Sequence, residues 1–224
     1  MYFGGEKVAA TQRWIFSILF LIGACIVSMA LAFVSVPYFN FLNSFICAKG
    51  AITRALLFSS GLLIIEFIII VFKPRFYGIQ LGESLKRWPA ILITTFGICS
   101  FTAIALFLTP STPYSEANWF VEMVIVPLSE EAMWRGVIFS ILLVLLRKLH
   151  DERTSLILAV IYSSFSFGLA HGGNMLVLPL QFVMMQVAYA TIVGLALGYL
   201  RAKTKSIYPP MLLHAAFNLT AILF

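Results

Sequence analysis

Residues 126–136 read Val126-Pro127-Leu128-Ser129-Glu130-Glu131-Ala132-Met133-Trp134-Arg135-Gly136, with three ionisable side chains within six positions. The flanking sequence is largely apolar from residue 119 to residue 146. One charge at the centre of a bilayer costs roughly 2.5–3.5 kcal/mol on insertion scales, so three would cost on the order of 8–10 kcal/mol without compensation. An ionisable cluster inside an apolar span therefore predicts a functional site with partners or a water-filled cavity around it.

The composition indicates a polytopic membrane protein. Of 224 residues, 61% are hydrophobic and 11% are charged, whereas soluble domains have about a quarter of their residues charged. The net charge of +6 would suggest nucleic acid in a soluble protein. Here the basic residues lie in short loops beside apolar runs, so no nucleic-acid partner is expected. The cysteines, Cys25, Cys47 and Cys99, lack the spacing of a metal site and read as plain thiols.

Seven apolar segments of roughly spanning length follow one another along the chain. They cover residues 14–34, 55–72, 89–108, 119–146, 155–171, 176–200 and 207–224. We therefore expect an all-α fold, a polytopic transmembrane bundle of about seven helices that forms one integral membrane domain over residues 1–224. Residues 76–88 are too polar to span. They suit either a short segment at the membrane interface or a solvated loop.

Loop charges predict the orientation. With the N-terminus inside, the outer loops hold only Lys49 and Arg54, and Arg135 lies within a span. The positive-inside rule therefore places the protein in the cell membrane with a cytoplasmic N-terminus and an outside C-terminus. The twelve inner residues are Lys7, Arg13, Lys73, Arg75, Lys86, Arg87, Arg147, Lys148, Arg153, Arg201, Lys203 and Lys205.

Other polar residues in or beside the spans each have a plain structural explanation. Glu66 could be a protonated acid bonded to a neighbouring helix, and Glu122 an interfacial carboxylate. His150 lies in a charged loop and is expected to be solvated. His171 alone is as well explained as an interfacial residue at a helix end. His214 and Asn218 are four apart, so they share a helical face, as a hydrogen-bonded packing pair would.

Together, these residues favour chemistry on water. Two of the three histidines fall in apolar runs of a chain that also carries the Glu130–Glu131 pair. A carboxylate and an imidazole supply a base near neutral pH, and a metal or hydrogen-bond donors would stabilise the oxyanion. The chain has no HExxH motif, no GxSxG setting and no lysine within a span. These absences disfavour a one-helix zinc protease and serine or Ser–Lys chemistry.

Three motifs in order resemble the CAAX prenyl protease and bacteriocin-processing (CPBP, or Abi) family of intramembrane proteases. Glu130 to Arg135 matches EExxxR, Phe167 to His171 matches FxxxH, and His214 to Asn218 matches HxxxN. The resemblance covers roughly residues 119–218, and Trp134 stands where many members have Phe. No comparable match exists in the first hundred residues.

The resemblance implies a helical membrane core with catalytic side chains facing a polar cavity. By motif, Glu130 and His171 would position and activate water, while His214 and Asn218 would stabilise the oxyanion. Glu131 belongs to the same motif. The family has been described both as metalloproteases and as metal-independent glutamate proteases, so zinc stays open. Glu130, His171 and His214 would form its ligand set.

The leading function is thus an intramembrane endopeptidase acting on membrane-associated proteins or peptides in the lipid bilayer. One alternative is a non-enzymatic scaffold or bacteriocin-immunity protein that keeps the cluster as a polar network. Another is a proton-coupled transporter, since buried Glu and His also form proton relays. The chain shows no inverted repeat, which disfavours the transporter.

Helix geometry separates the two glutamates. Glu131 and Arg135 are four apart with the acid first, which is the favoured orientation for a helical ion pair. Glu130 is turned roughly 100° away, toward the face of Trp134. We therefore expect Glu131–Arg135 to be a structural pair and Glu130 to act on water.

One estimate of depth conflicts with a site shared by both histidines. At 1.5 Å per residue, His171 lies roughly 25 Å into its span, and His214 only roughly 10 Å from its inner end. The two could meet if the helices are tilted or start at different depths. Pro209 and Pro210 would allow the last helix to begin inside the protein.

Overall fold

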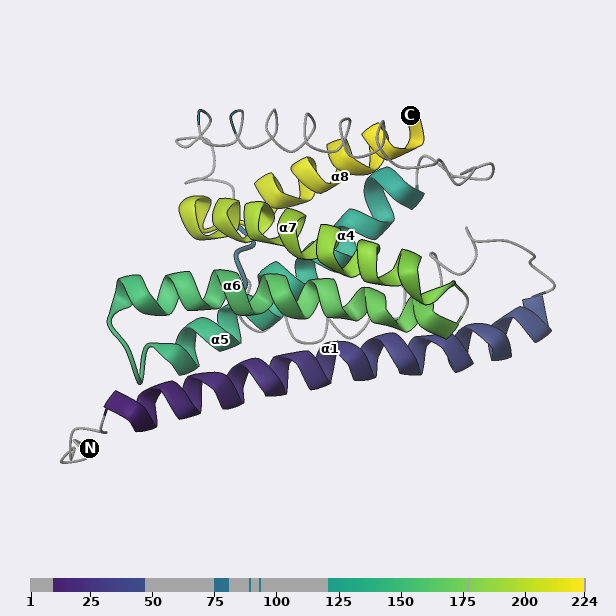
Figure 1. Cartoon of the computed structure of the whole chain (residues 1–224). Coiled ribbons are helices and arrows are strands. Elements are labelled where there is room, and N and C mark those ends of the chain that lie inside the picture. Colours follow the sequence, from purple (N-terminus) through teal and green to yellow (C-terminus); the bar gives the residue numbers. More distant parts are fainter. Residues whose placement is uncertain are drawn as a thin grey trace.

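The computed structural model describes residues 10–46, 75–80, 89, 93, 121–176 and 178–223 (Figure 1). Within these ranges every regular element is helical and no strand occurs, which confirms the all-α class for this part of the chain. The elements are α1 (Ala10–Ile46), the π-helical η2 (Val121–Ile125), α4 (Val126–Glu131), the π-helical η3 (Ala132–Ile138), α5 (Phe139–Leu146), α6 (Glu152–Ala170), the 3-10 helix η4 (His171–Leu176), α7 (Leu180–Thr204) and α8 (Tyr208–Leu223).

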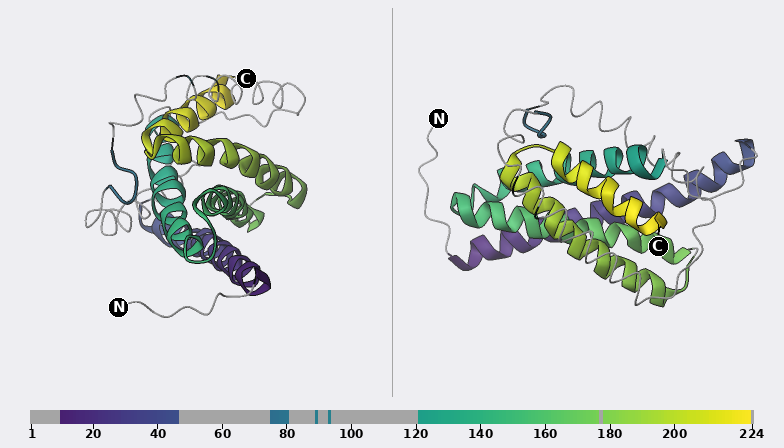
Figure 2. Two further views of the ribbon diagram at one scale, coloured as in Figure 1. Left: turned by 90° about the vertical axis from the view of Figure 1, so that its left-hand side faces the viewer. Right: turned by 90° about the horizontal axis from the view of Figure 1, so that it is seen from above.

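The bundle is built on the packing of α6 against α7. The long helix α1 lies along one side of α6, and α8 lies on the opposite side of the bundle against α7 (Figure 1). The continuous helical segment 121–146, formed by η2, α4, η3 and α5, runs from α8 across to α1 (Figure 2). Its middle is therefore enclosed by several helices, which is where the acidic pair lies.

Small residues let α6 and α7 approach closely. A Cβ atom on Gly168 would lie 2.0 Å from Oγ1 of Thr191, and one on Gly194 would lie 3.1 Å from Cβ of Ser164. Neither position could accept a larger side chain without moving a helix. Small residues at such contacts are the usual means by which membrane helices pack.

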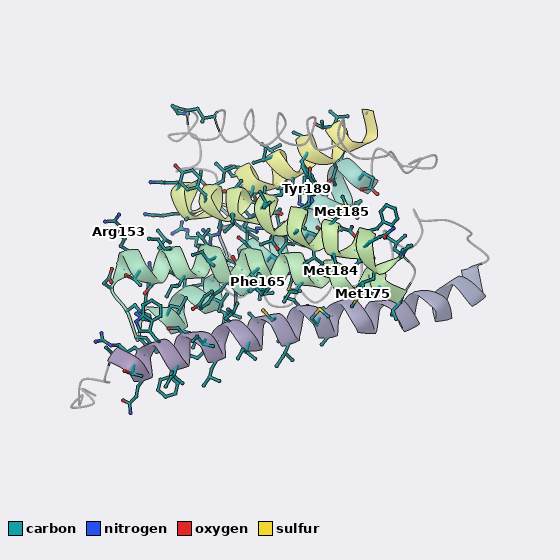
Figure 3. The ribbon with its side chains drawn as sticks, in the orientation of Figure 1. Arg153, Phe165, Met175, Met184, Met185 and Tyr189 are labelled. Atoms are coloured by element: carbon teal, nitrogen blue, oxygen red, sulfur yellow. The ribbon has the colours of Figure 1, made fainter. Side chains whose placement is uncertain are left out.

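Three helical stretches in the described part of the chain are long and apolar enough to cross a membrane: Ala10–Leu31, Glu152–Leu176 and Leu180–Thr204. Their outer surfaces are apolar, as a lipid environment allows. Figure 3 shows Phe165, Met184 and Met185 on the outer face of α6 and α7, where they are 43%, 60% and 53% exposed.

The predicted count of seven spans is not confirmed. The segments expected at residues 55–72, with Glu66, and at residues 89–108 lie outside the described residues, apart from the isolated positions 89 and 93. The segment at residues 119–146 is described from residue 121 and divides into π-helical and α-helical turns. The last helix, α8, has 16 residues, fewer than the roughly 17–25 that a spanning helix needs. The orientation of the termini stays a prediction.

The start of α8 explains how the two histidine motifs can meet. The connection from α7 is short, and Lys205 ends α7 with a left-handed backbone (φ 55°). Ile207, Pro209 and Pro210 are already buried. The last helix therefore begins inside the protein, as the two prolines allowed.

Two residues that were expected at the surface, Gly78 and His150, are buried or half-buried in the structure. Gly78, expected in an interfacial or solvated segment, is buried, and its carbonyl accepts a hydrogen bond from the Ile207 N–H at 3.1 Å. The turn at residues 75–80 therefore packs on the α7–α8 connection. His150 is half-buried, and its Nε2 lies 2.6 Å from Oγ of Ser17 on α1. Its expected solvation is wrong because α1 covers that loop.

Candidate active site

The acidic pair lies at the junction of α4 and η3, in a buried part of the described residues. All seven residues of η3, including the charged Arg135, are buried, so η3 is a core segment. At its end the N–H of Phe139 donates to the carbonyl of Trp134, five residues back. Such wide turns are rare and often mark functional sites in helices.

Glu131 and Arg135 form a fully buried ion pair. Nη1 of Arg135 donates to Oε1 of Glu131 at 3.0 Å, and both side chains are 0% exposed. Nη2 of Arg135 donates to the carbonyl of Gly194 on α7 at 3.3 Å. The pair has the four-residue spacing predicted from the sequence, and it ties the segment 121–146 to α7.

His214 joins this pair from α8. Its Nδ1 lies 2.9 Å from Oε1 of Glu131. An ionised carboxylate only accepts, so Nδ1 must carry the hydrogen and Glu131 fixes the orientation of the imidazole. Nε2 is then directed at Glu130, 3.7 Å from its Oε2.

The two adjacent glutamates therefore have different surroundings. The side chain of Glu131 is 0% exposed and bonded on the same oxygen by Arg135 and His214. The side chain of Glu130 is 14% exposed. Of these two, Glu130 is the one that combines proximity to an imidazole with access for water.

Phe167 occupies the centre of the site. Its ring lies under the guanidinium of Arg135, with Cζ 4.3 Å from the ring centroid, a cation–π contact. The rings of His171 and His214 pack edge-on against it, with centroids 5.0 Å and 6.0 Å away. The first residue of the FxxxH motif is thus the spacer that separates the two histidines and covers the ion pair.

His171 lies at the end of α6, half-buried. Its Nδ1 lies 3.0 Å from the carbonyl of Phe167, and since a carbonyl only accepts, Nδ1 is the donor. Nε2 is thereby left as the basic nitrogen. The structure brings His171 to the site through Phe167, whereas His214 contacts both glutamates.

Asn218 contacts Glu122, which was not among the predicted site residues. Its Nδ2 donates to the backbone carbonyl of Glu122 at 2.8 Å. Glu122 therefore lies beside the site, and its place at the membrane interface stays a prediction. The signal was in the spacing: Glu122 precedes Glu130 by eight residues, two helical turns on one face.

The two histidines have ring nitrogens free for a zinc ion, but among the described residues the ligand side chains do not converge. Both histidines use Nδ1 as a donor and leave Nε2 for a ligand, as metal-bound histidines commonly do. In the part of the chain that the structure describes, however, no three His, Cys, Asp or Glu side chains converge as a metal site requires. The residues in this arrangement do not fit a zinc centre, and zinc binding stays a prediction.

Residues 112–220 match the family model of type II CAAX prenyl endopeptidases of the Rce1-like kind. The match covers 109 of the 224 residues, and over this part the chain is similar to that family. The match confirms the resemblance that the three motifs predicted, and it supports a membrane protease in broad terms. Comparison with curated proteins gave no match, and comparison with solved structures gave none.

Proposed function

We propose that this protein is an intramembrane endopeptidase that hydrolyses peptide bonds of membrane-associated proteins or peptides, with Glu130 as the general base. The observation that carries the proposal is the 3.7 Å separation of Glu130 Oε2 and His214 Nε2. A water molecule can hydrogen-bond both atoms at once from beside such a pair. Similarity to this family makes proteins ending in a prenylated CAAX sequence the first substrates to test.

In this mechanism Glu130 accepts a proton from water as the water attacks the scissile carbonyl. A positioned base of this kind contributes typically about 10²- to 10⁴-fold to the rate. The ion pair of Glu131 and Arg135 holds His214 in place through the 2.9 Å bond to Nδ1. His171, with Nε2 basic, is the second candidate to handle the water or the leaving amine.

Asn218 is a proposed donor to the developing oxyanion, and His214 is the second when its ring is doubly protonated, with Nδ1–H on Glu131 and Nε2–H free to donate. They are one helical turn apart on α8, and the Asn218 amide is held by the Glu122 carbonyl. Donors fixed in advance in a dry site stabilise an oxyanion strongly. The single bond to Glu122 leaves the amide a second N–H for this purpose.

A purely structural polar network fits the site less well. Glu131 Oε2 and Arg135 Nε, both buried, have no partner among the described residues. A network retained only for packing would be expected to satisfy its members. Spare hydrogen-bonding capacity beside a reachable carboxylate favours a site that takes up water and substrate.

The test is cleavage by the purified full-length protein in lipid vesicles. Two probes are used: a fluorogenic farnesylated peptide ending in a CAAX sequence, and an apolar peptide without the lipid. Cleavage of either probe by the wild type, absent in Glu130→Gln, supports the proposal. A folded wild type that cleaves neither overturns the proposal and leaves the scaffold alternative ahead.

Zinc is tested on the same sample. Metal analysis near one equivalent per chain, with activity stopped by a chelator and restored by zinc, would support a bound zinc, for which Glu130, His171 and His214 would have to move together. Full activity in metal-free protein would leave water activation to Glu130 and the histidines.

A further inference from the structure

Arg201 is a buried cation outside the candidate active site. It lies one turn before the end of α7 and is 6% exposed. It is one of the basic residues predicted to lie on the inner side, and its side chain turns into the protein. Burying a guanidinium is costly unless its donors are matched, so its partners indicate what it does.

The first partner is a backbone carbonyl in the π-helical segment η3. In an α-helix the N–H of Phe139 would donate to the carbonyl of Arg135. Here that N–H donates to Trp134 instead, and Nε of Arg201 donates to the Arg135 carbonyl at 2.9 Å. The carbonyl of Arg135 thus lacks its α-helical donor, the N–H of Phe139. Arg201 donates to this carbonyl in its place.

The guanidinium is also fixed on its other sides. Nη2 donates to Oγ of Ser140 at 3.4 Å, and that hydroxyl donates to the carbonyl of Phe76 at 3.1 Å. The ring of Phe139 lies 5.1 Å from Cζ. Gly78 lies so close that a Cβ atom there would be 2.8 Å from Cζ, which explains why this turn carries a glycine with φ +86°.

We propose that Arg201 is a positioning residue: it holds the π-helical register at Arg135 and thereby the placement of Glu130 and Glu131 toward His214. Its catalytic consequence rests on the proposed function. Arg135 connects Arg201 to the acidic pair, because its backbone carbonyl accepts from Arg201 and its side chain donates to Glu131. Each residue turns an α-helix by about 100°, so relaxing the wide turn would rotate the glutamates away from α8.

The test compares Arg201→Met with Lys203→Met, both in full-length protein in vesicles. Lys203 is the matched control because it is on the same helix, exposed, with Nζ over the ring of Tyr199. Hydrogen exchange of the amides in residues 132–140 reports the register directly. The kcat and KM for the farnesylated CAAX peptide report its consequence.

In Arg201→Met we expect amide exchange in residues 132–140 to rise by about tenfold. The kcat should fall by about 10²-fold, as for a small misplacement of catalytic groups, with KM within about twofold of wild type. Lys203→Met should change neither. Arg201→Lys, which keeps the charge but not the planar fork, should recover part of both effects.

Wild-type exchange in residues 132–140 together with wild-type kcat in Arg201→Met would overturn the proposal. If that variant does not fold, Arg201→Gln takes its place under the same criteria. If the wild type cleaves no peptide, the proposed function fails, whereas the exchange measurement still decides the role of Arg201.

Discussion

Two clusters of acidic and basic side chains lie on the same helical segment and its following turn, in opposite surroundings. Inside the bundle, Glu131 pairs with Arg135 and both are fully buried. Between α5 and α6, Arg147 pairs with Glu152, and their side chains are 45% and 68% exposed. The chemistry of the two pairs is the same, so the difference between them isolates the effect of burial.

The two pairs differ in how much they are expected to stabilise the fold and in how far apart in sequence their members lie. Exposed pairs typically contribute about 0–1 kcal/mol, whereas removing one partner of a buried pair costs about 3–5 kcal/mol. The exposed pair is local, five residues apart. The buried pair takes its third member, His214, from 83 residues away in sequence. Only the buried cluster thus depends on the whole bundle.

The largest expected difference is in catalysis. Glu130→Gln should lower kcat by about 10²- to 10⁴-fold, because an amide cannot accept the proton from water. Glu152→Gln makes the same change in the exposed turn and should leave kcat unaltered. The measurement is turnover of the farnesylated peptide by both variants. Near wild-type cleavage by Glu130→Gln would rule out the proposed role of Glu130. The buried and exposed clusters would then not differ in catalysis.

Removal of the amide on α8 should have the next largest effect. Asn218→Ala should lower kcat by about 10²- to 10³-fold, as loss of an oxyanion donor does. Asn174→Ala is the matched control, since its amide in η4 makes a similar 2.8 Å bond to the side chain of Gln186 on α7. Equal kcat values for the two variants would assign Asn218 to helix packing.

The two arginines should differ in stability. Arg135→Leu strands the Glu131 carboxylate in the core and should cost about 3–5 kcal/mol. Arg147→Leu should cost at most about 1 kcal/mol. Denaturant unfolding in one detergent measures both. Similar losses for the two variants would mean that water reaches the inner pair and screens it.

The smallest effect should come from the exposed turn itself. Hydrogen bonds from the hydroxyl and then the N–H of Thr154 lower the pKa of Asp151 below its ordinary value of 3.8. A lowered acid pKa stabilises the fold above the unfolded-state value, and this contribution is lost as the pH falls through the folded-state value. Asp151 caps the start of α6, and Asp151→Asn keeps the cap without the charge. Between pH 7 and about pH 3, the Tm of the wild type should therefore fall slightly more than the Tm of this variant. Equal pH dependence in the two proteins would exclude a role for this charge.

The local features of the molecule could be read from its sequence. The i,i+4 spacing of Glu131 and Arg135 sufficed for the ion pair, because neighbouring turns of one helix bring such side chains together. The apolar runs sufficed for the helical class, because a backbone in lipid must satisfy its own hydrogen bonds. The three motifs sufficed for the family, which the match over residues 112–220 confirms.

What only the tertiary structure decided were the contacts between segments distant in sequence. The placement of His214 against both glutamates, of Glu122 beside Asn218, and of Arg201 on the Arg135 carbonyl all depend on helices that meet after folding. The π-helical register of residues 132–138 belongs here too, because periodicity reports which face is apolar and not how many residues fill a turn. These contacts could not be predicted because their geometry is set by how closely α6, α7 and α8 pack, a property of all their side chains together.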